Sequence, residues 1–210
     1  MSTKTVECEE NQFSPLHLDA LKEIGNIGAA HASTALTNLV HSEVMIDVPD
    51  CFVCRVEDLP SAFGNVAQEV VAVYLGAVGK EQGAILIVFP IKMAKGLSNV
   101  LLQREQDGSE TMDEDDLAAM AEIGNISASA YLNAIASMID TTMVPSPPGV
   151  ALDMLGAIMQ YPAQLVAEDY DYLVVIRTRF VHGQEAFPGF ILYIPDKDSR
   201  RRLMEKFGLE

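Results

Sequence analysis

The chain has 210 residues, a formal net charge of −16 and an isoelectric point near 4.5. This acidity argues against a nucleic-acid partner, because basic surfaces supply most of that affinity, and against anionic membrane surfaces. Half of the residues (49%) are hydrophobic, yet no apolar run approaches the roughly 18–20 residues that cross a bilayer. The first residues also lack the pattern of a secretory signal, so we predict a cytoplasmic protein.

The first predicted element is a long helix that follows a poorly ordered tail over residues 1–13. Ser14 is a suitable N-cap and Pro15 suits the first helical position, so the helix should run from there to about Val40. The segment EVMIDVPDCFVCRV after it reads as a β-strand. Cys51 and Cys54 are three residues apart and would point to opposite faces of that strand, so we interpret them as incidental and predict no metal site.

Further elements follow in the same order in both halves of the chain. Strand-like residues 66–90 lead into an amphipathic helix, IKMAKGLSNVLLQ, and then into the acidic stretch at 107–116. A second long helix should begin near Asp113, with Asp116 three residues on, and run to about Ile139. Strand-like residues 171–195 and a final helix close the second half. Each half therefore predicts helix, strand, short helix, strand, strand, helix.

The pentapeptide EIGNI occurs at residues 23–27 and again, 99 residues further on, at 122–126. A proline follows each Asn at the same distance, Pro49 after Asn26 and Pro148 after Asn125. We infer an internal duplication, with repeats of about 14–105 and 113–210 in one domain of residues 14–210. The predicted fold class is α+β with pseudo-two-fold symmetry, a central β-sheet and the two long helices outside it.

Helical periodicity places the repeated polar residues away from the core. Asp19, Glu23 and Asn26 fall on one side of the first helix, and Glu122 and Asn125 take the same place on the second. The residues predicted to face inward are Leu21, Ile24, Gly28, Ala32, Ala35 and Leu39 in the first helix, and Met120, Ile123, Ser127, Tyr131, Ala134 and Met138 in the second. Simple solvation could account for one Glu–Asn pair, and close helix–helix approach could account for the glycines.

The chemistry available to this pair is limited. Residues three apart on a helix are neighbours, and the chain shows no Cys–His or Ser–His pair beside them and no glycine-rich phosphate loop. An amide offers a donor and an acceptor without charge, which suits the orientation of a water molecule against an anion. We therefore expect an exposed site that docks on another protein, with Asn beside a phosphoryl group and Glu on a lysine of that partner.

The spacing Asp19-x3-Glu23-x2-Asn26-x22-Pro49, repeated as Glu122-x2-Asn125-x22-Pro148, resembles the CheC/CheX/FliY family of chemotaxis phosphatases. The stretches LKEIGNIGAAHASTAL and LDMLGAI resemble its CheC branch. The resemblance implies hydrolysis of the aspartyl phosphate on the response regulator CheY, with Asn26 and Asn125 orienting water and Glu23 and Glu122 docking the partner. It implies no cofactor on this chain and Mg²⁺ carried by CheY.

Two further expectations come from the resemblance. Asp19 would support the first site, whereas Ala118 at the equivalent position of the second cannot form hydrogen bonds. The stretch LDMLGAIM would dock the receptor deamidase CheD through Asp153, unless it is a buried helix. Two rival hypotheses remain: a non-catalytic adaptor that binds phosphorylated CheY or CheD, and a metal-dependent hydrolase with Glu23 and Glu122 as ligands.

Overall fold

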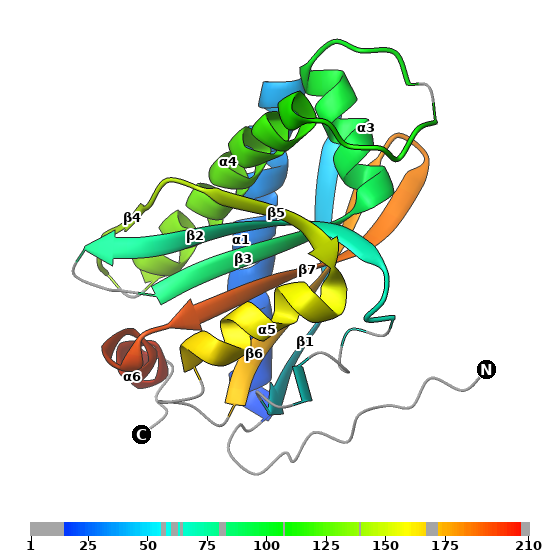
Figure 1. Ribbon diagram of the computed structural model, residues 1–210. Helices are drawn as coiled ribbons and strands as arrows, with labels where there is room; N and C mark the ends of the chain where they lie inside the picture. Colours follow the sequence, from blue (N-terminus) through cyan, green and yellow to red (C-terminus); the bar gives the residue numbers. More distant parts are fainter. Residues whose placement is uncertain are drawn as a thin grey trace.

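The computed structural model describes residues 15–55, 58–59, 63, 65–79, 83–106, 108–138, 140–166 and 172–206. The helices in these ranges are α1 (Pro15–Val40), α3 (Ile91–Leu101), α4 (Glu114–Met138), α5 (Leu155–Val166) and α6 (Lys197–Lys206). The strands are β1 (Val44–Arg55), β2 (Glu69–Gly79), β3 (Gly83–Pro90), β4 (Met143–Pro145), β5 (Gly149–Met154), β6 (Tyr172–His182) and β7 (Glu185–Pro195). The predicted α+β class is confirmed (Figure 1).

The two long helices begin and end close to the predicted residues. Helix α1 starts at Pro15 and ends at Val40, although the predicted cap Ser14 and the predicted tail lie outside the described residues. Helix α4 starts with a reciprocal cap: Asp113 Oδ1 accepts a hydrogen bond from Asp116 N at 2.8 Å, and Asp116 Oδ2 accepts one from Asp113 N at 2.9 Å. Such a pair satisfies backbone donors that a helix start leaves free.

The strands form one antiparallel sheet in the order β1-β6-β7-β3-β2-β4, and β5 also pairs with β2. Strands β3 and β7, one from each half of the chain, lie at the centre. Beyond them, β1 of the first half pairs with β6 of the second, and β4 and β5 of the second half pair with β2 of the first. This order is symmetric in the two halves, as a duplication would produce, and the duplication itself stays a prediction.

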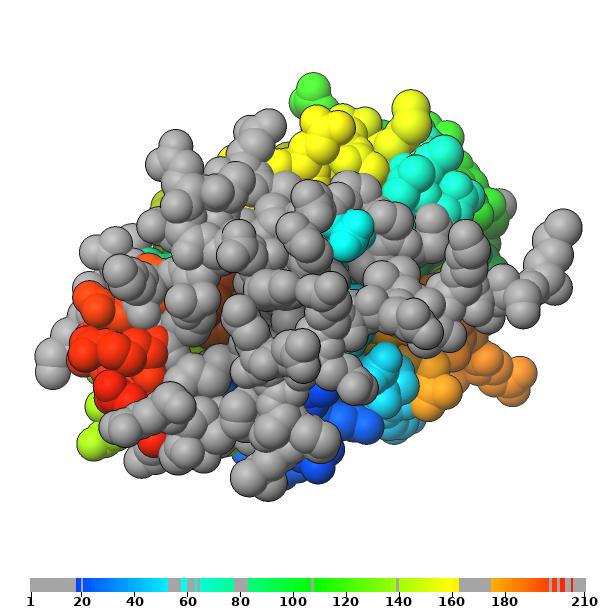
Figure 2. All heavy atoms as spheres, turned by 90° about the horizontal axis from the view of Figure 1, so that it is seen from below, coloured from blue at the N-terminus to red at the C-terminus, as the bar shows by residue number. Residues whose placement is uncertain are grey.

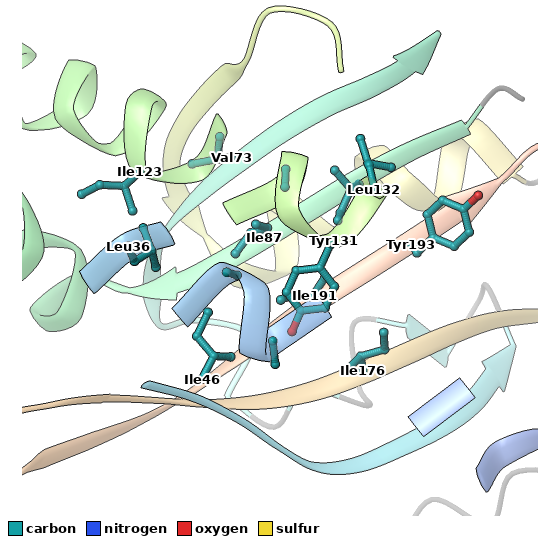
Figure 3. Packing of buried hydrophobic residues seen from close by; sticks show 14 of the residues in the cluster. Leu36, Ile46, Val73, Ile87, Ile123, Tyr131, Leu132, Ile176, Ile191 and Tyr193 are labelled. Atoms are coloured by element: carbon teal, nitrogen blue, oxygen red, sulfur yellow. The ribbon is translucent and has the colours of Figure 1, made fainter. Parts of the chain in front are cut away.

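Helices α1, α3 and α4 cover one face of the sheet (Figure 1). Most residues predicted to face inward are buried there: Leu21, Ile24, Gly28 and Ala32 on α1, and Met120, Ile123, Ser127 and Tyr131 on α4. Figure 3 shows Tyr131 and Leu36 between these helices and the strand residues Ile46, Ile87 and Ile176. The hydrophobic stripe of each helix therefore fixes which side of that helix meets the sheet.

Helix α5 covers part of the opposite face, where Leu155, Ile158 and Met159 pack on a second apolar cluster that includes Val70, Leu86 and Leu192. The strands β2, β3 and β7 are consequently buried on both faces, which explains the almost continuous apolar runs in their sequences. Among the described helices, none combines the length and the apolar character that crossing a membrane requires.

Candidate functional site

The motif residues of the first half lie on the surface of α1. Asp19, Glu23 and Asn26 are all exposed, while Ile24 and Gly25 between them are buried against the sheet. None of the three polar side chains forms a hydrogen bond or an ion pair within the part of the chain that the structure describes. Their functional groups are therefore available to another molecule.

The second copy of the motif is less exposed. Glu122 and Ala118 are exposed on α4, whereas Asn125 is half-buried. Helical periodicity predicted that both polar residues point outward. The prediction is confirmed for Glu122 and only partly for Asn125. Neither side chain has a hydrogen-bond or ion-pair partner among the described residues.

The glycine of each EIGNI motif lies against a strand. A Cβ atom at Gly25 would lie 3.3 Å from Val48 Cγ1 on β1 and 3.2 Å from Ile176 Cγ2 on β6. A Cβ atom at Gly124 would lie 2.4 Å from Val73 Cγ1 on β2. Close helix–helix approach, which the sequence left open, is therefore wrong as the explanation of these two glycines. Their missing side chains let each helix pack closely on the strands at the residue before the motif Asn.

Helix α1 also binds the free edge of β1 through small hydroxyl side chains. Ser33 Oγ accepts a hydrogen bond from Ile46 N at 2.8 Å, and Thr37 Oγ1 accepts one from Val44 N at 3.0 Å. In Figure 2, residues of α1 (blue) and β1 (light blue) lie side by side at the surface. The sequence gives no sign of this contact, because nothing in the helix alone shows which strand lies next to it.

The motif prolines lie where the outermost strands are irregular. The pairing of β1 with β6 shifts register between Asp47 and Asp50, which brackets Pro49. Pro148 lies in the interruption between β4 and β5, both of which pair with β2. Since proline cannot donate a ladder hydrogen bond, it is expected at sheet edges and bulges.

Asp153 lies on β5, and its carboxylate accepts a hydrogen bond from Met154 N at 2.7 Å. Its neighbours Leu152 and Met154 are large apolar residues with exposed fractions of 37% and 53%. The stretch that contains them divides into this exposed strand and the start of α5, where Leu155 is fully buried. The alternative of a buried helix therefore describes only the second part of the stretch.

Asp116 anchors α4 to α3 through a buried carboxylate. The sequence had indicated only that this residue lies at the start of the helix. Asp116 accepts hydrogen bonds from Lys95 Nζ at 2.6 Å, Ser98 Oγ at 2.9 Å and an Arg104 guanidinium nitrogen at 3.2 Å. Burial alone would raise the pKa of this carboxyl, but the bonds from Lys95, from the Asp113 backbone and from Ser98 together lower it below its ordinary value.

Among the residues that the structure describes, the remaining titratable groups do not assemble into a second centre. Within the described ranges, no three His, Cys, Asp or Glu side chains gather as metal ligands. Cys51 is buried in β1, as the predicted strand requires, and burial together with the nearby Asp50 raises the pKa of its thiol to about 12. At neutral pH this cysteine is therefore a protonated core residue.

The model of the CheC-like family matches residues 16–52 and 116–152, which contain both copies of the motif. The chain is 29% identical over 203 residues to "CheY-P phosphatase CheC" of Bacillus subtilis (strain 168), a match that covers 94% of this chain and 97% of that protein. These similarities confirm the predicted resemblance to CheC-type chemotaxis proteins.

Two solved structures show how widely this fold occurs. Thermotoga maritima FliY superimposes with a TM-score of 0.77 at 20% identity, over 93% of this chain and 98% of the other. A chain of the FliG–FliM complex from H. pylori superimposes with a TM-score of 0.65 at 13% identity, over 92% and 100% of the two chains. At these identities the likeness concerns the fold alone, so the site has to be argued from its residues.

Proposed function

We propose that this chain, which carries the repeated motif and the fold of CheC-type proteins, is a phosphatase that hydrolyses the aspartyl phosphate of phosphorylated CheY. The observation that supports the proposal best is that the motif side chains of the first site are exposed and unpaired among the described residues. Glu23 and Asn26 are exposed neighbours on one helix turn with no partner among the described residues, and the same pair recurs at Glu122 and Asn125. The name of the B. subtilis relative agrees with this reaction.

Each side chain has a separate task in the proposed reaction. The amide of Asn26 or Asn125 holds a water molecule in line with the phosphorus atom, and positioning of this kind can contribute several orders of magnitude to a rate. The water oxygen bonds to phosphorus while the bond to the aspartyl oxygen breaks, which releases inorganic phosphate and the free carboxylate. Glu23 or Glu122 pairs with a lysine of CheY, and the Mg²⁺ that balances the phosphoryl charge is carried by CheY.

The test is the decay of phosphorylated CheY with and without the protein. We expect Asn26→Ala and Asn125→Ala each to remove the contribution of one site. The double variant should lose at least about 100-fold in the rate of decay and should unfold at the same midpoint as the native protein. Asn38 and Asn133 are exposed asparagines on the same helices but outside the motif. Alanine at both of these positions is the matched control and should leave the decay rate unchanged.

The same assay separates the rival hypotheses. An adaptor would leave the decay of phosphorylated CheY unchanged or slow it, because binding would shield the acyl phosphate from water. A metal-dependent hydrolase with Glu23 and Glu122 as ligands would lose activity when the protein itself is stripped of metal before Mg²⁺-loaded CheY is added. Retained activity of the double Asn variant would reject the proposed mechanism.

We further propose that the exposed end of β5 docks CheD. Leu152 and Met154 offer an apolar surface at the sheet edge with Asp153 between them. Asp153→Arg and Met154→Asp should abolish binding of CheD in titration calorimetry. Val144→Asp changes an equally exposed apolar residue on β4 (exposed fraction 52%) and should leave that binding intact.

A further inference from the structure

The prolines that follow each motif Asn have no task in the mechanism above. Both lie at edges of the sheet, Pro49 inside the irregular part of β1 and Pro148 in the interruption between β4 and β5. Edge protection would account for a proline anywhere along such a strand. Edge protection does not explain why each proline follows its Asn at the same distance, which suggests that the proline and the Asn lie close together.

Helix α1 and strand β1 run in opposite directions along the free edge of the sheet. Thr37 binds the amide of Val44, and Ser33, four residues earlier on the helix, binds the amide of Ile46, two residues later on the strand. The two distances match: four residues along the helix, from Thr37 to Ser33, span about 6 Å, and two residues along the strand, from Val44 to Ile46, span about 6.6 Å. The strand amides along this edge are thus satisfied by acceptors on one stripe of α1.

Asn26 belongs to the same stripe. It lies seven residues, or about two turns, before Ser33, which places it level with a point on the strand about 10.5 Å beyond Ile46. At about 3.3 Å per strand residue this position is Pro49. The contact of Gly25 with Val48, 3.3 Å from a Cβ atom to Cγ1, supports the register. Asn26, the third acceptor of the stripe, is therefore level with the one residue type that has no backbone N–H.

The second half varies the same arrangement in an informative way. The equivalents of Ser33 and Thr37 are Leu132 and Ala136, so α4 has lost both hydroxyl acceptors. The loss does not depend on the strand, because Pro145 has no N–H whereas Met143 keeps one. Asn125 is the acceptor of this stripe that α4 keeps, although Pro148, the equivalent of Pro49, cannot donate. An acceptor kept opposite a proline in both halves is kept for a molecule other than the strand.

We propose that Pro49 and Pro148 are positioning residues, which keep the side-chain amides of Asn26 and Asn125 free by removing the strand N–H that would otherwise bind them. The inference rests on the proposed function, in which those amides hold the attacking water. With alanine at residue 49, the new N–H would be captured by Asn26 Oδ1 just as Ser33 captures that of Ile46.

The experiment uses variants with a single active site. In the Asn125→Ala protein, where only the first site works, Pro49→Ala should slow the decay of phosphorylated CheY by about two- to tenfold, the worth of one net hydrogen bond. Amide hydrogen exchange at residue 49, measured by NMR, should be protected in Pro49→Ala and unprotected in Pro49→Ala/Asn26→Ala. The exchange measurement does not depend on any phosphatase activity.

Pro148→Ala repeats the test in the Asn26→Ala protein, so that a folding defect at one proline leaves the other position informative. Pro145→Ala in the same background is the matched control and should leave the rate unchanged. Pro145 is the equivalent of Ile46, and Leu132, the equivalent of Ser33, offers no side-chain acceptor. An unchanged rate in both test variants, or an unprotected amide at residue 49, overturns the proposal. Self-association without a change in rate also overturns it, since the prolines would then only protect the sheet edges. Failure of the proposed function would show separately, as activity that survives in the double Asn variant.

Discussion

The ring of Tyr131 lies against the backbone of Gly28, so that a Cβ atom at residue 28 would be 2.4 Å from Cδ1 and 2.7 Å from Cε1 of the ring. Tyr131 is fully buried, and Figure 3 shows it between the two long helices and the sheet. This contact sets how closely α1 and α4 approach. It also relates the two sites, because Gly28 follows Asn26 by two residues and Tyr131 follows Asn125 by six.

Gly28→Ala should destabilise the protein. The added methyl group gains up to about 1 kcal/mol of helix propensity, but it overlaps a buried ring that has little room to move, and such overpacking costs about 1–3 kcal/mol. We expect a similar loss for Gly124→Ala, whose methyl group would meet the branched side chain of Val73 at 2.4 Å. Urea unfolding followed by circular dichroism measures both changes.

Gly96 on α3 supplies the matched control for these substitutions. Nothing lies within 4 Å of a Cβ atom at this position. Gly96→Ala should therefore show the propensity gain alone and stabilise the protein by about 0.5–1 kcal/mol. Equal effects at Gly28 and Gly96 would mean that the Tyr131 contact does not constrain the helix pair.

Tyr131→Phe should leave the protein as stable or make it more stable. The Tyr131 hydroxyl is buried and has no hydrogen-bond partner among the described residues, and an unpaired buried hydroxyl costs about 1–3 kcal/mol. Phenylalanine keeps the ring that packs on Gly28 and removes that cost. A loss of more than about 1 kcal/mol in urea unfolding would show that the hydroxyl is bonded, for example to an internal water molecule.

Asp116→Ala should cost about 3–5 kcal/mol, because it leaves the nearly buried ammonium group of Lys95 without its carboxylate. The exposed fractions of the two side chains are 0% for Asp116 and 11% for Lys95. Glu114→Gln removes an exposed acid from the same first turn of α4 and should cost less than about 1 kcal/mol. Similar losses in the two variants would rule out the buried network as the anchor of α4.

The same carboxylate predicts a dependence of stability on pH. Its pKa is lower in the folded protein than the ordinary value of 3.8, so the folded state binds this proton more weakly than the unfolded state does. The stabilisation is complete above that ordinary value and is lost as the pH falls through the lower folded pKa. Unfolding experiments between pH 5 and pH 2, values chosen to span the transition, should show a steeper loss for the native protein than for Asp116→Asn.

Local sequence determined the boundaries and orientation of the long helices. Pro15 begins α1 and the paired Asp113 and Asp116 begin α4, because proline geometry and capping act within one turn. The exposure of Glu23 and Asn26 follows from helical periodicity alone. The repeat itself indicated where chemistry is concentrated, since packing of the helix does not require a Glu–Asn pair at the same place in both halves.

Contacts between distant segments decided the rest. Only the fold brings Val48 and Val73 against the two motif glycines, places the edge of β1 beside Ser33 and Thr37, and leaves Asn125 half-buried while Asn26 is exposed. Towards each edge of the sheet a strand of one half pairs with a strand of the other, β1 with β6, and β4 and β5 with β2. The neighbours of each motif therefore come from residues that periodicity cannot relate to it. Helix geometry is set by bonds four residues apart, whereas the surroundings of a site depend on which surfaces are buried together.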